Sequence, residues 1–319
     1  MMSPWSALKR RGVLGINERN IRFTLGENPR EFYPLVDDKL KTKHLCELAG
    51  IPVAPVYAKA ERHGDVRSLV ESLRDKSDFV LKPAGGAMGN GILVIGEATD
   101  TGWLSLSGRA ISPVQLAYHA ESIVSGLYTL GGKPDVAFAE ERLLLHSDFD
   151  RISYEGVPDI RIIVFRGIPV MAMTRLPTKR SSGRANLHQG AVGAGIDIAS
   201  GRTTYAVVGS RPIDSHPDTG ETIPGFSIPQ FATALRAAIR ATDETKLGYV
   251  GADVVVDARY GPVILELNAR PGLAVQLANR SGLRPRLDAI RAMSVKGSDH
   301  TSELEERITL GCKIAEACR

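Results

Sequence analysis

Three oxygen-bearing side chains late in the sequence have the types and spacing of a divalent-metal site. Asp253 belongs to an apolar run before a Tyr-Gly-Pro turn at 260–262, and Glu266 and Asn268 follow that turn. Side chains of a strand alternate between its faces, so Glu266 and Asn268 point to the same side. If residues 251–273 pair as a hairpin, Asp253 faces them. Hard oxygen ligands suit Mg²⁺; the alternative is a hairpin with ordinary solvated acids.

A second stretch with chemical potential is FVLKPAGGAMGNGILVI at residues 79–95, which reads as strand, glycine loop, strand. Lys82 ends the first strand. The loop glycines are Gly85, Gly86, Gly89 and Gly91. Such a loop lets backbone N–H groups approach phosphate oxygens, and a lysine adds positive charge beside them. No GK[ST] ending follows, so this is not a Walker loop. A flexible turn is the alternative, and Lys39 would add a second cation if its helix folds over the same site.

Two arginines lie on a strand pair that the sequence predicts at DIRIIVFRG (159–167) and IPVMAMTRL (168–176). Arg161 is on the first strand, two residues after Asp159, and Arg175 is near the end of the second. Period-2 alternation supports both strands. Arginines at strand ends are often surface charges, so these two alone indicate little.

The segment TKRSSGRANLHQGAVGAG at residues 178–195 is polar, basic and rich in glycine, and it has no periodicity. One interpretation is a disordered surface loop. The other is a mobile lid that closes on phosphates and excludes water. The side chains that would close are Lys179, Arg180, Arg184, Asn186 and His188.

The elements that position these residues divide the chain into four segments. We expect an N-terminal arm at 1–36, a first lobe with the glycine loop at 37–135, a second lobe at 136–284 and a helical tail at 285–319. A helix that begins at Asp37, a candidate N-cap, and ends at Gly50 opens the first lobe. The second lobe contains an insertion between Gly195 and Pro229 with the motif HPDTG at 216–220.

Composition narrows the class of protein. The 319 residues carry a formal net charge of +4, which suits a phosphate- or carboxylate-bearing substrate but is too diffuse to indicate nucleic acid. The three cysteines include no CxxC pair, which is typical of a reducing cytoplasm and argues against a disulfide framework or a thiolate zinc site. No signal-peptide core or run of transmembrane length is evident, so we expect a cytoplasmic protein that does not bind membranes.

In their order along the chain, these motifs resemble the ATP-grasp superfamily over roughly residues 37–277. Within it, the chain resembles the ribosomal-protein glutamate ligases and the alpha-L-glutamate ligase-like proteins. The second likeness, through GVLGIN, YPLVDDKL and NARPGL, covers nearly the whole chain. The insertion with HPDTG looks more like the sugar-transfer-associated ATP-grasp group. The resemblance implies an α+β fold in which two α+β lobes clamp a nucleotide, here without a full pre-grasp domain.

The resemblance also implies roles for individual residues. ATP would be bound through phosphate contacts by Lys39, Lys82 and the flap Gly85–Gly91, through the adenine hinge at Glu140, Glu141 and Arg142, and through Asp159, Arg184 and Asn186. Asp253, Glu266 and Asn268 would bind Mg²⁺, with two ions bridged by Glu266 and Mn²⁺ as a substitute. Arg161, Arg175 and Arg270 would hold the substrate carboxylate and the reaction intermediate.

The function implied is an ATP-dependent carboxylate–amine ligase that works through an acylphosphate, adding glutamate or another amino acid to a peptide or small acceptor. One alternative is an ATP-grasp phosphotransferase that acts on a hydroxyl, or a sugar-transfer-associated enzyme. Another is a nucleotide-binding module without catalysis, which the complete set Asp253, Glu266 and Asn268 disfavours. The sequence leaves open the two substrates, single addition against polymerisation, and whether the chain forms a homo-oligomer.

Overall fold

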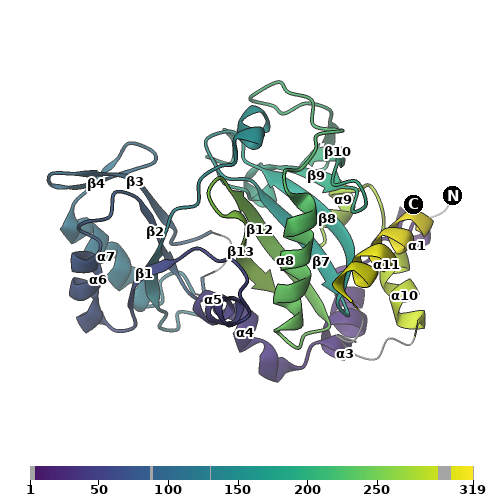
Figure 1. Cartoon of the computed structure of the whole chain (residues 1–319), viewed down its shortest axis with the longest axis horizontal. Helices are drawn as coiled ribbons and strands as arrows, with labels where there is room; N and C mark the ends of the chain where they lie inside the picture. Colours follow the sequence, from purple (N-terminus) through teal and green to yellow (C-terminus); the bar gives the residue numbers. More distant parts are fainter. Residues whose placement is uncertain (1–3, 87–88, 130, 294–302, 319) are drawn as a thin grey trace. The chain divides into compact units, whose positions relative to one another are not determined.

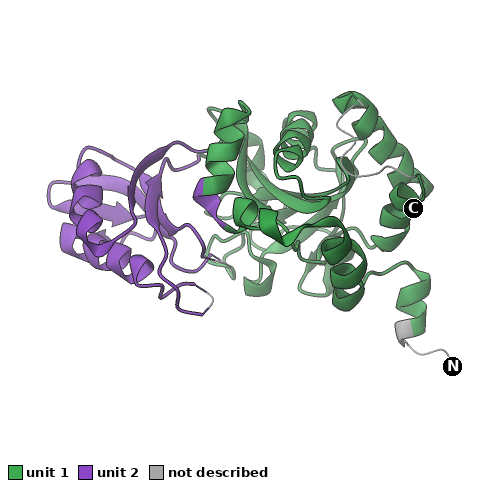
Figure 2. Ribbon diagram, turned by 90° about the horizontal axis from the view of Figure 1, so that it is seen from below, with its two compact units in different colours: residues 1–37, 41–53, 144–319 green, residues 38–40, 54–143 purple. Residues whose placement is uncertain are grey.

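A computed structural model describes residues 4–86, 89–129, 131–293 and 303–318 (Figure 1). The described chain forms two compact units (Figure 2): unit 1 contains residues 1–37, 41–53 and 144–319, and unit 2 contains residues 38–40 and 54–143. The arm at 1–36 and the tail at 285–319 therefore group with the second lobe, and the lobe boundary lies at 143/144. No helix in the described ranges is both long and apolar enough to cross a bilayer.

Unit 2 is built on a six-stranded antiparallel sheet in the order β1-β6-β2-β3-β4-β5. Its elements are β1 (Val56–Ala60), a 3₁₀ turn (His63–Asp65), α6 (Val66–Ser72), β2 (Phe79–Pro83), β3 (Leu93–Thr99), β4 (Gly102–Ser105), β5 (Ala110–Ile111), α7 (Pro113–Val124) and β6 (Ala137–Glu140). Helix α7 begins at a capping box, in which Ser112 accepts from the Gln115 N–H and Gln115 binds the Ser112 N–H. Apolar residues of α6 and α7, including Leu69 and Leu116, share one core with Phe79 of β2.

Unit 1 is built on a seven-stranded antiparallel sheet in the order β11-β10-β9-β8-β7-β12-β13. Its strands are β7 (Asp159–Phe165), β8 (Ile168–Leu176), β9 (Val192–Ile196), β10 (Thr203–Val208), β11 (Arg211–Ile213), β12 (Tyr249–Asp257) and β13 (Gly261–Asn268). The hairpin of β12 and β13 confirms the strand-turn-strand prediction for this stretch.

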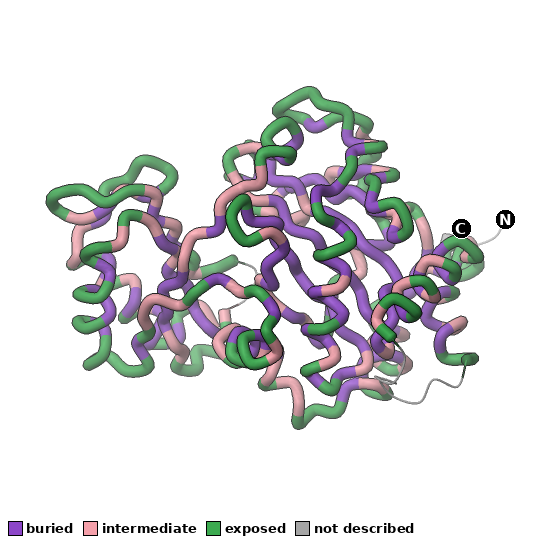
Figure 3. Tube along the Cα trace, in the orientation of Figure 1, coloured by how far each residue is buried: buried purple, intermediate pink, exposed green. Residues whose placement is uncertain are grey.

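The central strands of unit 1 are buried on both faces (Figure 3). On β7, Ile162 belongs to a core that also contains Leu235 of helix α8 (Phe231–Asp243). Its neighbour Ile163 belongs to a different core, with Val275 of helix α9 (Val275–Ala278). Successive side chains alternate because strand side chains have a period of two. The sheet thus separates two apolar layers, and the polar residues of the candidate site interrupt the second one.

Short helices and turns form the remainder of unit 1. They are α1 (Pro4–Arg10), α2 (Ile16–Glu18), a π-helical turn (Arg19–Thr24), α3 (Leu25–Glu27), a 3₁₀ turn (Arg30–Phe32), α4 (Pro34–Asp37), α5 (Lys39–Leu48), 3₁₀ turns at Ser147–Ile152 and Leu187–Gln189, α10 (Arg284–Ala292) and α11 (Leu304–Ala317). The first two residues of α5, Lys39 and Leu40, belong to unit 2. The predicted cap of α5 was wrong by one residue, since the Leu40 N–H donates to Asp38 at 2.9 Å, whereas Asp37 ends α4.

Candidate active site

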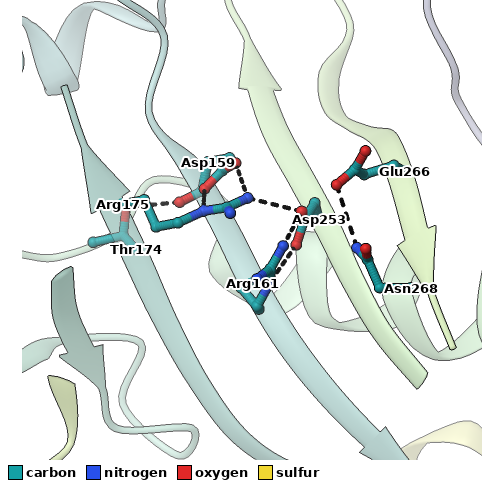
Figure 4. A network of polar contacts seen from close by, with 7 residues as sticks. All are labelled: Asp159, Arg161, Thr174, Arg175, Asp253, Glu266 and Asn268. Carbon is teal, nitrogen blue, oxygen red and sulfur yellow. Dashed lines mark hydrogen bonds and ion pairs between the residues drawn. The ribbon is translucent and has the colours of Figure 1, made fainter. Parts of the chain in front are cut away.

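Six of the candidate site residues of unit 1 lie on one face of four adjacent strands, β8, β7, β12 and β13 (Figure 4). The strand register pairs Asp159 with Arg175 across β7 and β8, and it pairs Arg161 with Asp253 across β7 and β12. Asp253 is in turn opposite Glu266 of β13. Directly opposed residues share a face of the sheet, so charges up to 107 residues apart in sequence meet on one face, in two adjacent cross-strand rows.

Asp253 is the centre of this group of charges. Its side chain is fully buried, and Oδ1 accepts from Arg161 Nε at 2.7 Å. Its Oδ2 accepts from Arg161 Nη2 at 2.6 Å and from Arg175 Nη2 at 2.7 Å. Arg175 also donates to Asp159, from Nε at 2.6 Å and through a second contact from Nη2. Two guanidinium groups therefore hold two buried carboxylates in a continuous network.

Burial and charge act against each other on these groups. Burial raises the pKa of Asp253, but Arg161 and Arg175 outweigh it and hold that pKa below its ordinary value. For Asp159, burial raises the pKa to about 6, although Arg175 opposes the shift. Burial would lower the pKa of Arg175, but the charges of Asp159 and Asp253 raise it. Arg175 is therefore a permanent cation shared by two acids of different strength.

Glu266 and Asn268 lie beside this network on β13, and both are half-buried. The Asn268 amide donates to Glu266 Oε1 at 3.3 Å, so the two side chains adjoin each other on the same face. The carboxylate oxygens of Glu266 and the amide oxygen of Asn268 fit Mg²⁺. A flip of the Asn268 amide would present this oxygen in place of its nitrogen. Asp253 already accepts three guanidinium bonds, so it would join such an ion only through its remaining lone pairs or by releasing an arginine. Within the described ranges, no cluster of three or more His, Cys, Asp or Glu side chains is arranged to hold a metal.

In unit 2, Lys82 contacts the carboxylate of Glu140, a pairing that was not predicted from the sequence. Lys82 Nζ forms an ion pair with Glu140, and its ammonium lies 5.3 Å from the ring centre of Phe138. Both charged side chains are almost fully buried, at 4% and 3% exposure. The contact joins β2 to β6, whose register places Lys82 opposite Phe138 and Glu140 opposite Val80. The sequence had assigned Glu140 only to the adenine hinge.

The glycine loop is contacted by Lys39, the cation expected near it from the sequence. Lys39 Nζ donates to the carbonyl of Gly86 at 2.5 Å, and the Gly85 N–H donates to Asp135 at 2.9 Å. A side chain at Gly86 would collide with Pro83, 2.2 Å from the Cβ position, and one at Gly91, which has φ +76°, would meet the Tyr128 ring at 2.6 Å. Gly89 is described too, whereas residues 87 and 88 of the predicted flap lie outside the described ranges.

The remaining predicted site residues have identified partners. The Glu141 N–H donates to the Pro55 carbonyl at 2.9 Å, so backbone pairing already uses this N–H of the predicted hinge. Arg142 Nε donates to Asp78 at 2.9 Å. In the basic loop, which we define as residues 178–190, Asn186 accepts from the His188 N–H at 3.0 Å and Arg184 lies 3.4 Å from Gln189 Oε1. Arg270 is 54% exposed and lies over the Tyr33 ring, so it is the most accessible of the three candidate substrate arginines.

The sequence matches the model of a protein family described as sugar-transfer associated ATP-grasp, over residues 18–292. No curated protein was found to match it. Among solved structures, the chain is similar to the ATP-grasp ligase PsnB complexed with minimal precursor (16% identity, TM-score 0.43, 84% of this chain and 63% of that one). It is also similar to PsnB with precursor peptide PsnA2 and AMPPNP (16%, 0.44, 85% and 61%). A third is N5-carboxyaminoimidazole synthetase from Staphylococcus aureus complexed with ADP (14%, 0.43, 77% and 48%).

The chain spans less than two thirds of the length of these solved chains. The predicted resemblance to the ATP-grasp superfamily and the predicted fold are confirmed by the family match, whereas the closer resemblance to glutamate ligases stays a prediction. Since the matched region takes in both sheets and every candidate site residue, the chain belongs to the sugar-transfer associated ATP-grasp family.

Proposed function

We propose that the protein is an ATP- and Mg²⁺-dependent carboxylate–amine ligase that forms an amide or peptide bond through an acylphosphate. The observation that supports this most strongly is the polar face of β8, β7, β12 and β13, which gathers three acids, two arginines and an amide. Such a face suits charge neutralisation during phosphoryl transfer. The substrates that we propose are a small-molecule or peptide carboxylate and an amine, with glutamate or another amino acid as the group added.

The proposed reaction has two steps. A substrate carboxylate oxygen attacks the γ-phosphorus of ATP, the bond to the bridging oxygen breaks, and ADP leaves. The amine nitrogen then attacks the acyl carbon, the bond to the phosphate oxygen breaks, and the nitrogen loses a proton as the amide forms. The protein contributes orientation and charge rather than a covalent nucleophile. Water has to be excluded because an acylphosphate hydrolyses.

Unit 2 supplies the lysines in this proposal. Lys82 and Lys39 would contact phosphate oxygens beside the glycine loop, and the hinge at Glu140, Glu141 and Arg142 would bind adenine through its backbone. For Lys82 to bind a phosphate, its ammonium has to share or leave Glu140, with which it now pairs. Because an ammonium carries three N–H donors in no fixed plane, it can contact a carboxylate and a phosphate together.

Unit 1 supplies the metal ligands and the arginines. Glu266, Asn268 and Asp253 would hold Mg²⁺, which when bound neutralises phosphate charge. Asp159 fixes Arg175, and Asp253 fixes Arg161, so that both guanidinium groups keep one orientation toward the reacting groups. Arg270, the exposed arginine, is the one that we expect to contact the substrate carboxylate. Arg184 and Asn186 of the basic loop would bind the phosphates.

Release of ADP from ATP tests the proposal, with Mg²⁺ and candidate carboxylate–amine pairs as substrates. We expect Glu266→Ala to decrease the rate at least about a hundredfold, since one electrostatic stabiliser has this order of effect. Glu244→Ala, which removes an exposed acid of the same unit, should leave the rate unchanged. If the wild type binds ATP but releases ADP with none of the pairs, the ligase proposal fails.

A second candidate function follows from the family's description as sugar-transfer associated. The same residues can transfer the γ-phosphate to a hydroxyl, of a sugar for example, and stop at that step. Hydroxylamine separates the two, because an acylphosphate reacts with it to give a hydroxamate and a phosphate ester does not. Hydroxamate that forms only with ATP and a carboxylate supports the ligase, whereas ADP release without any hydroxamate supports the phosphotransferase.

A further inference from the structure

The HPDTG segment, residues 216–220, is part of the insertion in unit 1, and neither the fold nor the proposed reaction accounts for it. It forms a tight turn, in which the His216 N–H donates to the Glu221 carbonyl at 2.8 Å and the Gly220 N–H donates to the His216 carbonyl at 2.9 Å. His216 is fully buried although the residues around it are exposed. A buried imidazole within an exposed turn needs partners for both ring nitrogens.

Both ring nitrogens of His216 have such partners. Nε2 lies 2.9 Å from the Pro177 carbonyl, and Nδ1 lies 3.3 Å from the backbone nitrogens of Asp218 and Thr219. A carbonyl only accepts and a backbone N–H only donates, so the proton is on Nε2 and Nδ1 accepts. The imidazole is therefore held neutral in a single tautomer. Burial lowers the pKa of His216, in keeping with that state.

Pro177 is the residue directly before the basic loop, so His216 fixes the place where the loop leaves the sheet. A second bond acts two residues further on, where the Lys179 N–H donates to Asp218 Oδ2 at 2.7 Å. The Pro177 carbonyl also accepts from the Tyr154 N–H at 3.1 Å, which ties the same point to a third segment. Two side chains of the HPDTG segment thus bind the backbone at two points, Pro177 and Lys179, where the loop starts.

The loop is closed at its base by its own hydroxyl groups. Thr178 Oγ1 donates to the Gly190 carbonyl at 3.0 Å and accepts from the Ser181 N–H at 3.0 Å. Thr178 and Ser181 are buried, whereas Lys179 and Arg180 are exposed. The base is therefore fixed and the cations point outward, an arrangement that reduces the entropy lost when cations are ordered on an anion.

We propose that the HPDTG segment positions the basic loop, and that His216 and Asp218 are positioning residues for its cations. His216 acts through the Pro177 carbonyl, and Asp218 acts through the Lys179 N–H. Neither residue needs to contact a substrate. That the positioned loop serves phosphate binding rests on the function proposed above, whereas the positioning itself does not.

Limited digestion of the full-length protein with trypsin tests the positioning directly, because trypsin cleaves after Lys179, Arg180 and Arg184 only when the loop opens. We expect His216→Ala to speed cleavage at these bonds about tenfold, the effect of one buried hydrogen bond. His216→Gln should restore slow cleavage, since its amide can donate to the Pro177 carbonyl and accept from the Asp218 N–H. Cleavage after Arg67, an exposed residue of unit 2, is the internal reference.

Asp218 gives a second, milder pair of variants in case His216→Ala does not fold. Asp218→Ala should speed loop cleavage about threefold to tenfold, whereas Asp218→Asn, which keeps an acceptor oxygen, should behave as the wild type. Loop cleavage that stays slow in both alanine variants overturns the proposal, as does fast cleavage in Asp218→Asn.

The kinetic readout separates this proposal from the proposed function. In variants with an open loop, we expect the KM for ATP to rise about tenfold, with a smaller change in kcat. An unchanged KM despite fast loop cleavage overturns the link to phosphate binding and leaves the positioning intact. If the wild type releases no ADP with any substrate pair, the proposed function fails, and the digestion pattern still decides the positioning.

Discussion

The two units hold their buried cations in different ways. In unit 2, Lys82 pairs with a single carboxylate, that of Glu140. In unit 1, Arg175 divides its N–H groups between Asp159 and Asp253. An ammonium is a compact charge that can exchange partners, whereas a guanidinium is a planar fork whose orientation its carboxylates fix. The lysine pair would therefore suit the exchange of partner that we propose for Lys82 on phosphate binding, and the arginine network would suit the fixed orientation that we propose for Arg175.

The largest effect that we predict comes from breaking the ion pair between Lys82 and Glu140. Lys82→Met leaves the Glu140 carboxylate buried without its cation, and it should lower the free energy of unfolding of unit 2 by about 3–5 kcal/mol. Lys82→Met combined with Glu140→Gln should recover most of this loss, because the uncompensated charge is gone. Urea unfolding followed by the fluorescence of Trp103, which is buried in the core of unit 2, measures both, in a Trp5→Phe background.

Lys133→Met, which removes an exposed lysine of unit 2, is the matched control and should change stability by less than about 0.5 kcal/mol. A double variant that remains as unstable as Lys82→Met would contradict the description of Lys82 and Glu140 as an exchangeable pair.

The arginine network should respond differently to the same kind of test. Arg175→Met removes the cation of Asp159 but leaves Asp253 with Arg161, so we expect a loss of about 3 kcal/mol. Adding Asp159→Asn should recover only part of it, since Asp253 has still lost one bond. Hydrogen exchange of the β7, β8 and β12 amides measures the change, with Arg211→Met, at an exposed position on β11, as control. Full recovery in the double variant would show that this network, too, is built of separable pairs.

The sequence predicted the parts of this network that local rules determine. Alternation along β13 and the turn before it place Glu266 and Asn268 on one face and bring Asp253 opposite Glu266, as observed. The bonds of Arg161 and Arg175 were not predictable, because their carboxylate partners lie on other strands, up to 92 residues away. Nothing in the local pattern distinguishes an arginine at a strand end that faces solvent from one that faces a buried acid.

The N-terminal arm shows the same limit for the fold. Its residues have no clear periodicity, yet the described part of it, residues 4–36, forms short helices and turns. Asn28 explains part of this order, since its amide accepts from the Tyr249 N–H at 2.8 Å and donates to the Tyr249 carbonyl at 2.7 Å, across 221 residues. When contacts this distant in sequence fix a segment, its own residues show little of the periodicity from which helices are predicted. The hairpin of β12 and β13, by contrast, has both its alternation and its turn within about twenty residues.

A smaller effect should come from pH, through Asp159. Its pKa of about 6 exceeds the ordinary value of 3.8, so the folded protein binds this proton more tightly than the unfolded chain does. The free energy of unfolding should therefore decrease as pH rises from about 4 to about 6, by on the order of 2 kcal/mol. The pKa of Asp253 is lowered instead of raised, so its contribution to the free energy of unfolding changes only at pH values below this window.

Unfolding of the wild type and of Asp159→Asn at pH 4, 5, 6 and 7 measures this contribution. The stability of the wild type relative to the variant should fall across the window and then level off. Asp214→Asn, at an exposed acid of the same unit, should show no such trend. A difference that is constant with pH would mean that the pKa of Asp159 is not raised in the folded protein, and burial would then not outweigh Arg175 at this carboxylate.

The smallest predicted effect concerns an ion pair at the surface of unit 2. Arg142 donates to Asp78, and their side chains are 25% and 27% exposed, so water screens the pair. Arg142→Gln should lower stability by less than about 1 kcal/mol, against the larger loss for Lys82→Met in the same unit. If the hinge binds adenine through its backbone, the KM for ATP should also change little in this variant. A large rise in KM would instead mean that the Arg142 side chain itself contacts the nucleotide. A part-exposed cation of unit 2 would then bind ATP as the buried Lys82 is proposed to do, and burial would not distinguish the two roles.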